Sequence, residues 1–428
     1  MLLTLLIFLV LLAFIFLGFP IFMSLLITGI LFVIAGGNSM ELTIVKMFGS
    51  VNSLSLLAIP FFIIAGNIIM RAKITDKLVS FADALVGWLK GGLGHVNIVS
   101  SMLFGGIQGS GAADAAAIGG MLIPAMEEQG YDKDYAVAVT AGSSMISPII
   151  PPSIAFILYS YYTEVPIAHM FMGGLVPGIL IGLMQMVVNR ITYSRRGYNF
   201  PLTRFSIKNL FRCTVKSFGA LLMPLIILMG IVFGIVTPTE SGVLAILYGL
   251  FYGFVISKTL KLKDIPKILA DSAITTSVVF MTIAAAGVLS NVLVRLHFQT
   301  EVQNFAVNVL GNPVLAAGFL FIIFIILGMF LDPTVIIAMF ATTTLAIGNS
   351  FGFSPIHFGV VMTIMMQLGA ITPPVGTFLF ISCGVAGLPM EKSIKPLLPY
   401  IGVIILAMIL CFAFPQIVTW LPDLLYGA

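Results

Sequence analysis

Two proline pairs interrupt apolar stretches that are otherwise long enough to form membrane-spanning helices. The pairs at 151–152 and 373–374 lie within residues 134–163 and 356–385. A helix that stops inside the hydrocarbon exposes carbonyl oxygens at one new end and amide hydrogens at the other, and each costs several kcal/mol if it is left unsatisfied. The carbonyl end suits a small hard cation such as sodium, and the positive amide end suits a carboxylate. The breaks therefore predict sites for a cation and for an organic anion.

Glycine-containing segments separate two further pairs of short apolar stretches. Residues 105–111 are Gly-Gly-Ile-Gln-Gly-Ser-Gly, and residues 328–334 are Gly-Met-Phe-Leu-Asp-Pro-Thr. Each apolar arm is too short to cross about 30 Å of hydrocarbon. We therefore expect re-entrant helical hairpins over 93–126 and 313–348, each with its tip facing the broken helix of its own half. The alternative is that the prolines only kink packed helices and the glycines only allow neighbouring helices to approach closely. The hairpin and the break occur together twice, which favours the interpretation as binding sites.

Each hairpin tip and its break together supply backbone carbonyls, assisted by Ser and Thr hydroxyls. The candidate cation ligands are Gly106, Ser110, Ser147, Ile150 and Ser153 in the first half and Gly328, Asp332, Gly369, Thr372 and Val375 in the second half. The candidate substrate contacts are Gln108, Ser110, Gly111, Asp114 and Thr334. We expect sodium to bind first and the substrate carboxylate to lie between the two tips.

Carboxylates within the predicted membrane segments are scarce. Burying one costs roughly 2.5–3.5 kcal/mol, so each is a functional candidate. Asp114 and Asp332 belong to the two hairpins, where the alternative role is to cap the second helix. For Asp332 the two roles are compatible. Glu240 is expected to be a first-turn carboxylate, and for His95 and Gln108 a structural role stands beside contact with a substrate.

The composition determines the class of protein. Of the 428 residues 60% are hydrophobic and only 8% are charged, whereas a soluble domain has about 25% charged residues. This excludes a soluble enzyme and a nucleic-acid binder, and it predicts an all-α polytopic membrane protein in contact with a lipid bilayer. The cysteines Cys213, Cys383 and Cys411 are far apart, and the histidines show no paired spacing, so neither a transition-metal site nor an organic cofactor is expected.

The chain contains an internal repeat. With a shift of 222 residues, 7 of 31 positions match between 147–177 and 369–399. With a shift of 224, residues 67–87 and 291–311 share an Asn, an Arg, a Phe-Ala pair and a Gly. Two stretches in the same order with nearly the same shift indicate a duplication, in which each half carries one hairpin and one broken helix.

Basic residues orient the two repeats. We predict a first repeat over 1–190, a cytoplasmic linker over 191–215 and a second repeat over 216–428. If the hairpins do not cross the membrane, 18 of the 20 Lys and Arg residues lie on the cytoplasmic side, and only Lys46 and Arg295 lie outside. In this arrangement the chain crosses the membrane ten times, and the two repeats have opposite orientations in the membrane. Inverted repeats with broken helices at matching positions are the architecture of secondary transporters.

Apart from the hairpins and broken helices, eight apolar runs are long enough to cross a membrane. Two less apolar segments beside the hairpins, 76–90 and 300–311, are expected to be interfacial helices. The eight runs lie near residues 2–18, 20–36, 51–70, 168–190, 216–236, 239–257, 270–294 and 396–418.

These motifs together resemble the large membrane subunit, of the DctM type, of tripartite ATP-independent periplasmic (TRAP) transporters. The resemblance covers essentially the whole chain. It rests on the glycine-rich tip, the Ser-x-x-x-Pro-Pro break, the Thr-Pro-Thr-Glu-Ser-Gly element at 237–242, the Asp-Pro-Thr tip and the Thr-Pro-Pro break.

The resemblance implies a sodium-coupled elevator in the bacterial inner membrane. It also implies two partners, a small membrane subunit of the DctQ type and a soluble periplasmic binding protein that delivers an organic acid. Substrates of the family include C4-dicarboxylates, sialic acid and other sugar acids. Because the chain starts directly with the large-subunit pattern, we expect the small subunit to be a separate protein.

Three alternatives stand beside this interpretation. A stand-alone sodium- or proton-coupled carboxylate transporter would need no binding protein, and only the resemblance argues against it. A membrane-embedded enzyme would need a nucleophile and base, a metal motif or a carboxylate cluster, and the sequence contains no GxSxG, HExxH or DDxxD motif. A simple channel would need no mirrored hairpins.

Overall fold

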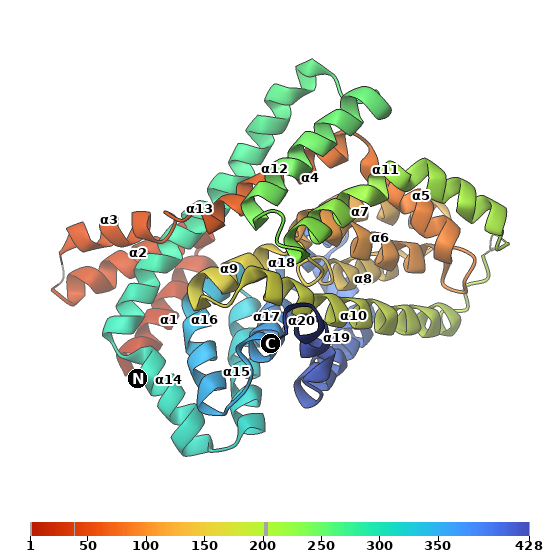
Figure 1. The fold of residues 1–428 in the computed structure, drawn as a ribbon. Helices are drawn as coiled ribbons and strands as arrows, with labels where there is room; N and C mark the ends of the chain where they lie inside the picture. Colours follow the sequence, from red (N-terminus) through yellow and green to blue (C-terminus); the bar gives the residue numbers. More distant parts are fainter. Residues whose placement is uncertain (1, 38, 201–203, 428) are drawn as a thin grey trace.

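The computed structural model of the protein describes residues 2–37, 39–200 and 204–427. Every regular element in these ranges is helical, as the sequence predicts (Figure 1). Six helices are long and apolar enough to cross a membrane by length and composition: α10 (Ile167–Arg195), α11 (Ile207–Val232), α12 (Pro238–Phe251) with its continuation η2 (Tyr252–Ile256), α13 (Ile265–Arg295), α16 (Pro333–Ser350) and α19 (Met390–Ala413). Large apolar side chains such as Phe211 and Leu183 point outward from them, which suits a lipid surrounding.

One group of helices, the first bundle, combines elements from both halves of the chain. It consists of α1 (Leu2–Phe16), α2 (Ile21–Ala35), α3 (Met40–Gly49), η1 (Ser55–Leu57), α4 (Ala58–Arg71) and α5 (Ile74–Val86) together with α11, α12 and α13. Helix α13 packs on α2 and α4, α12 packs on α4, and α11 packs on α5. In Figure 1, α13 runs along the outer side of the molecule from the region of α2 to that of α12.

The remaining helices form the second bundle, which contains the predicted hairpins and broken helices. Its members are α6 (Gly92–Gln108), α7 (Gly111–Glu128), α8 (Lys133–Ser144), α9 (Ile154–Thr163), α15 (Pro313–Gly328), α17 (Pro355–Leu368), η5 (Gly369–Ile371), α18 (Thr377–Ala386) and α20 (Gln416–Tyr426) together with α10, α16 and α19. Two short elements, α14 (Phe298–Asn304) and η4 (Phe305–Leu310), connect α13 to the second bundle, whereas η3 (Leu262–Asp264) joins η2 to α13 within the first bundle.

Both hairpins form as the sequence predicts. Helices α6 and α7 join at Gly109 and Ser110, and the Ser110 hydroxyl accepts a hydrogen bond from the Ala113 amide as the N-cap of α7. Helices α15 and α16 join through residues 329–332, and Asp332 is the N-cap of α16. Ser110, and not Asp114, therefore caps the first hairpin, whereas the capping role expected for Asp332 is confirmed.

Both broken helices also form where the proline pairs stand. Helix α8 ends at Ser144 and α9 starts at Ile154, and α17 is followed by η5 before α18 starts at Thr377. Proline lacks an N–H and clashes with the preceding turn, so neither helix continues through its pair.

Matching backbone conformations relate the two halves. Helix α4 ends at Arg71, and α13 ends at Arg295, as the repeat predicts. Two residues further on, Lys73 has φ 55° and His297 has φ 54°, in the left-handed region that non-glycine residues seldom adopt. Helix α5 then leaves α4 at an angle of 73°. Each half thus has a left-handed residue at the same point before its hairpin. Most of both expected interfacial segments is helical, in α5 and in α14 with η4.

Three segments differ from the expectations. The run 396–418 is not one helix, because α19 ends at Ala413 and Pro415 precedes a separate helix, α20. Helix α3 was not expected. The ends of the linker 191–215 are helical, since α10 extends to Arg195 and α11 starts at Ile207.

Hydrogen-bonded ion pairs hold the start of the linker against the N-terminal end of α8. The Arg196 guanidinium donates hydrogen bonds of 2.8 Å to both oxygens of the Asp134 carboxylate and to Asp132. The hydrogen bond to Asp134, with those to Tyr198 and Asp132, holds the pKa of Arg196 above its usual range. The Tyr135 ring lies 5.5 Å from the guanidinium carbon. This bidentate contact fixes the chain after α10 against the second bundle.

The Thr-Pro-Thr-Glu element starts α12 with a capping box. The Thr237 amide donates to the Glu240 carboxylate at 2.7 Å, and the Glu240 amide donates to the Thr237 hydroxyl at 3.3 Å. Glu240 is therefore the first-turn carboxylate that the sequence predicts. Thr239 donates to the Leu54 carbonyl at 3.1 Å, which ties the start of α12 to the start of α4.

Candidate functional site

The first hairpin tip lies directly against the first break. A Cβ added at Gly105 would lie 2.8 Å from the Cα atom of Ser147, so a side chain larger than hydrogen does not fit there. The Ile154 amide, at the start of α9, donates to the Gly109 carbonyl at 3.3 Å. Gly106 lies one residue further, where an added Cβ would be 3.8 Å from the Pro151 carbonyl oxygen.

The second tip meets the second break in the same way. A Cβ added at Gly328 would lie 2.7 Å from the Cα atom of Gly369. The Gly376 amide, just before α18, donates to the Met329 carbonyl at 3.3 Å. Both hairpins therefore touch their breaks through glycine, and both contacts carry one backbone hydrogen bond. We call these contacts the first and second junctions.

Carbonyl groups at the junctions remain available for a ligand. Within the described ranges, the carbonyl oxygens of Ser147, Ile150, Thr372 and Val375 accept no hydrogen bond. The Ser147 hydroxyl is fully buried and has no partner either. A buried oxygen without a donor is costly unless a cation or water approaches it.

The other hydroxyls of the breaks are already engaged. Ser153 donates to the Pro148 carbonyl and accepts from the Phe156 amide at 3.1 Å, so it caps α9. Thr372 donates to the Leu368 carbonyl at 2.9 Å, which leaves its lone pairs as possible ligands.

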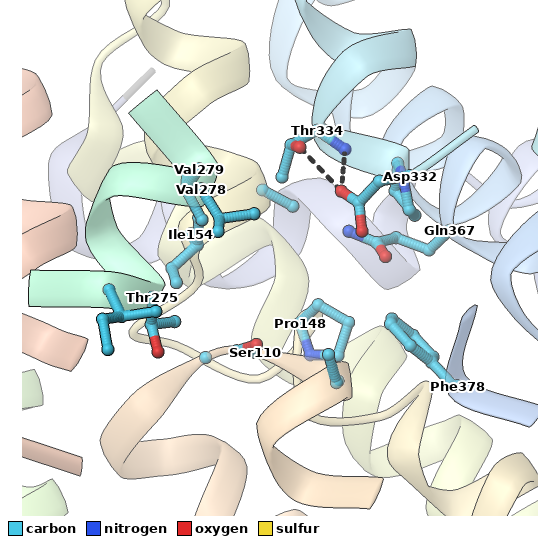
Figure 2. Close-up of a pocket in the computed structure, with 16 residues that line it drawn as sticks. Ser110, Pro148, Ile154, Thr275, Val278, Val279, Asp332, Thr334, Gln367 and Phe378 are labelled. Carbon is cyan, nitrogen blue, oxygen red and sulfur yellow. Dashed lines mark hydrogen bonds between the residues drawn. The ribbon is translucent and has the colours of Figure 1, made fainter. Parts of the chain in front are cut away.

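A cavity of about 360 Å³ lies between the two tips and the two breaks (Figure 2). Helix α13 of the first bundle closes one side with residues 274–279. The described lining residues are Gly109, Ser110, Gly111, Ala112, Pro148, Ile154, Ala155, Ile274, Thr275, Val278, Val279, Asp332, Pro333, Thr334, Gln367 and Phe378. None of these is Lys, Arg or His.

The polar groups of this cavity gather at the second tip. The Asp332 carboxylate accepts from the Thr334 amide at 2.9 Å and from the Thr334 hydroxyl at 2.6 Å, both through Oδ1. Figure 2 shows Gln367, from the last turn of α17, beside this carboxylate with its amide directed toward the centre of the cavity. Ser110 lies on the opposite side.

Three of the predicted substrate residues, Ser110, Gly111 and Thr334, line the cavity, but two others do not. Gln108 is buried against α4, where a Cβ added at Gly66 would lie 2.8 Å from its Cγ. Asp114 is fully buried in the first turn of α7, and neither carboxylate oxygen has a hydrogen bond within the usual distance.

Sequence reasoning missed Gln367 and Thr275. The available signal for Gln367 was a lone amide in the otherwise apolar run 364–368, directly before the second break. Thr275 stands in the polar triplet Thr-Thr-Ser at residues 275–277 of α13. Neither residue belongs to a motif, so only their position in the folded chain distinguishes them.

Metal-binding side chains do not gather anywhere in the described ranges, since no three His, Cys, Asp or Glu residues lie close enough to hold an ion. A cation at the junctions would therefore depend mainly on backbone carbonyls and hydroxyls, which are ligands for a hard cation such as sodium. Hairpins and broken helices that face one central cavity define a polytopic membrane transporter rather than an enzyme.

Comparison with known proteins gives the family. Residues 8–417 match the DctM component of tripartite ATP-independent periplasmic transporters. The chain belongs to this family of transporter permeases and is thus a multi-pass protein of the bacterial inner membrane.

Several relatives are similar over almost the whole chain. The sialic acid TRAP transporter large permease protein SiaM of Vibrio cholerae is 31% identical, with 96% of each chain covered. The C4-dicarboxylate TRAP transporter large permease protein DctM of the same species is 33% identical over 96% of this chain and 95% of the relative. The isethionate TRAP transporter permease protein DctMQ of Oleidesulfovibrio alaskensis is 31% identical over 94% of this chain and 63% of the relative.

The YdaH transporter of Alcanivorax borkumensis has a similar solved structure. The TM-score is 0.60, over 87% of this chain and 88% of the other, at 12% sequence identity. This likeness concerns the fold alone.

Proposed function

We propose that this protein performs sodium-coupled uptake of an organic acid. A periplasmic binding protein delivers the acid, and a small membrane subunit of the DctQ type completes the complex. Membership of the TRAP permease family supports the organic-acid substrate and both partners. The relatives named above transport sialic acid, C4-dicarboxylates or isethionate according to their names, so an acidic group is the common feature.

The observation that supports sodium coupling is the pair of matching junctions beside one cavity. Each junction presents carbonyl oxygens without donors, and the first also presents the unpartnered Ser147 hydroxyl. A sodium ion at each junction would draw the hairpin onto its break and so shape the tip that contacts the substrate. Binding of sodium would then favour binding of the acid, and by linkage the reverse holds as well.

The division into two bundles supports an elevator mechanism. Both junctions lie within the second bundle, whereas the cavity is closed on one side by α13 of the first bundle. In this mechanism the second bundle carries sodium and substrate together past the first bundle, which stays fixed in the membrane. After this movement, another part of the first bundle would replace α13 as the wall of the cavity.

The first experiment is a thermal-stability titration of the purified complex with the small subunit, comparing sodium and potassium at constant ionic strength. A ligand that binds only the folded state stabilises it by about 2.7 kcal/mol at a hundredfold excess over Kd. We expect a saturable increase in Tm with sodium and none with potassium. Equal curves for the two ions would contradict sodium coupling.

A second experiment tests the need for a binding protein. Uptake of a labelled organic acid into proteoliposomes is measured with and without a candidate binding protein, under an inward sodium gradient. We expect uptake only when the binding protein and the sodium gradient are both present. Uptake without the binding protein would instead support a stand-alone carboxylate transporter.

A further inference from the structure

The start of α11 emerges from the first bundle. Residues 207–216, which we call the linker end of α11, contain no buried side chain. From Ser217 onward the helix is held by its neighbours. The buried Ser217 hydroxyl donates to the Lys77 carbonyl of α5 at 2.8 Å. The Tyr248 hydroxyl of α12 donates to the Gly219 carbonyl at 2.7 Å. In Figure 1 α11 reaches the edge of the molecule beside α5, so its linker end can contact a partner.

The length of α11 places its linker end at the level of the lipid headgroups. The 26 residues of the helix measure about 39 Å at 1.5 Å per residue, whereas the hydrocarbon core of a bilayer is about 30 Å thick. Trp88, a residue type favoured at membrane interfaces, lies against Phe205 just before α11, with 5.3 Å between the ring centroids. The orientation predicted from the basic residues puts this level in the cytoplasmic leaflet.

Two kinds of side chain alternate along the linker end. Ile207, Phe211 and Val215 are apolar and are 76%, 70% and 60% exposed. Residues four positions apart lie on one side of a helix, so these three form an apolar stripe. A basic residue follows each of them, and the three basic residues form a second stripe beside the first. This basic stripe consists of the exposed residues Lys208, Arg212 and Lys216.

No acidic group of this chain neutralises the basic stripe. Within the described ranges its residues make no ion pair and no side-chain hydrogen bond. The sequence contains no Asp or Glu between Glu164 and Glu240. Helix α5, which packs on α11, adds no net charge. Its acidic and basic residues, with the residue that precedes the helix, are Asp76, Asp83, Lys73 and Lys77. The basic stripe is therefore available to an anion from outside the chain.

An apolar stripe beside a basic stripe fits a phospholipid with an anionic headgroup. Acyl chains can cover Ile207 and Phe211, while the phosphate contacts the neighbouring Lys and Arg side chains. A soluble acidic partner would match only the charges and would leave the apolar stripe exposed to water.

We propose that the basic stripe binds the headgroups of anionic phospholipids and so fixes the linker end of α11 in the membrane. The partner is thus a lipid surface of negative charge. This inference goes beyond the proposed function, because the basic stripe belongs to the first bundle and involves neither the junctions nor the central cavity.

The test titrates the detergent-purified complex with dioctanoyl-phosphatidylglycerol and, separately, with dioctanoyl-phosphatidylcholine, and records Tm at low, constant ionic strength. The two lipids have the same acyl chains, but only the first has a net negative charge. We expect a saturable increase in Tm that is clearly larger with phosphatidylglycerol. Each Lys or Arg near an anionic surface contributes roughly a factor of five in affinity. Arg212→Gln should therefore raise the half-saturating phosphatidylglycerol concentration about fivefold, and replacement of the whole basic stripe by Gln about a hundredfold.

The matched control removes the same number of charges elsewhere on the first bundle. It combines Lys258→Gln, Lys263→Gln and Lys267→Gln, which replace three exposed lysines near Asp264 and Asp271 on the same predicted side of the membrane. This variant is expected to respond to phosphatidylglycerol as wild type does. None of the replaced residues, in the basic stripe or in the control, makes an ion pair within the described part of the chain. Without lipid, the Tm of both triple variants should therefore stay near that of wild type.

Three results would overturn the proposal. Equal Tm increases with the two lipids in wild type would show that only the apolar stripe matters. An unchanged phosphatidylglycerol response in the basic-stripe variant, or an equal loss in the control, would show that no local site exists. Loss of the small subunit during purification of the basic-stripe variant would identify the stripe as a subunit interface instead. If the triple variant does not fold, the single variant Arg212→Gln decides between these outcomes.

Discussion

Two serines of the first break illustrate how residues of one type serve different purposes. The Ser153 hydroxyl caps α9 and is saturated by contacts within the protein. The Ser147 hydroxyl is as deeply buried but has no partner. A cap stabilises the fold whether or not an ion is present, whereas an unpartnered hydroxyl contributes only when a ligand approaches.

This difference leads to opposite expectations for two alanine variants. Ser147→Ala removes a group without a protein partner, so we expect stability without sodium to stay near wild type and sodium affinity to fall about tenfold. Ser153→Ala is expected to lower stability by about 1 kcal/mol at every sodium concentration, with the sodium response retained. Thermal denaturation across a sodium titration measures both effects.

The reverse pattern would show that the roles have been assigned wrongly. In particular, an unchanged sodium response in Ser147→Ala, together with an unchanged response in Thr372→Ala, would remove these side chains from the ligand set. The backbone carbonyls at the junctions would then become the main candidate ligands.

At the scale of the elements, the function depends on how closely a hairpin approaches its break. Glycines allow this approach, because no side chain separates Gly105 from Ser147 or Gly328 from Gly369. Each hairpin is also held to its break by a single backbone hydrogen bond, to Ile154 in the first half and to Gly376 in the second. Such a contact is close enough to bring carbonyls from both elements to one ion.

Gly328→Ala should therefore separate the second hairpin from its break. Because the added Cβ meets backbone rather than a flexible side chain, we expect a loss of about 1–3 kcal/mol and a weaker sodium response. Thermal denaturation with and without sodium provides the measurement.

Gly318→Ala is the control within the same helix. A Cβ at Gly318 would meet nothing within 4 Å, so the substitution should raise stability slightly by favouring the helix, by roughly 0.5–1 kcal/mol. If both variants responded to sodium alike, close packing at the junction would not be required for sodium binding.

At the scale of the whole molecule, an elevator requires the two bundles to move relative to each other. Gly66 of α4 and Gln108 of α6 lie on opposite sides of the boundary, and a Cβ at Gly66 would be 2.8 Å from the Cγ atom of Gln108. Gly249 and Ile68 both lie in the first bundle, with 3.7 Å between an added Cβ and the Ile68 Cβ. Disulfides form at Cβ separations of about 3.5–4.5 Å, which the pair Gly249 and Ile68 meets. At Gly66 the added Cβ lies next to the Gln108 Cγ, the atom that a cysteine sulfur at position 108 would replace.

We predict opposite results for the two cross-links in a background where Cys213, Cys383 and Cys411 are replaced by serine. Oxidation of the pair Gly66→Cys with Gln108→Cys should stop uptake into proteoliposomes, and reduction should restore it. Oxidation of Gly249→Cys with Ile68→Cys should leave uptake unchanged, because that bond joins helices of one bundle. Single-cysteine variants control for each substitution alone.

Full uptake through the cross-linked boundary would rule out relative motion of the bundles at this contact. A loss of uptake in both cross-linked proteins would point instead to a general need for flexibility. Gel mobility after oxidation, with and without reductant, verifies that the bonds form.

Much of the architecture could be predicted from the sequence because its signals are local. A proline pair ends a helix whatever surrounds it, and a glycine-rich turn between short apolar arms makes a hairpin. The repeat relation then assigned each break to a hairpin, and the contacts of Gly105 and Gly328 with the two breaks agree with that assignment. The capping role of Asp332 and the first-turn position of Glu240 could likewise be predicted from adjacent residues.

Which polar side chains share the central cavity was decided only by the tertiary structure. Gln108 and Asp114 stand in the hairpin motif, yet Gln108 packs against α4 at the boundary and Asp114 is buried within the second bundle, while Gln367 and Thr275 belong to no motif and face the cavity. The physical reason is that a helix in a membrane is apolar on most faces, so its sequence carries little information about which face is turned inward. That rotation is set by packing against helices distant in the chain, such as α4 against Gln108 and α13 across the cavity.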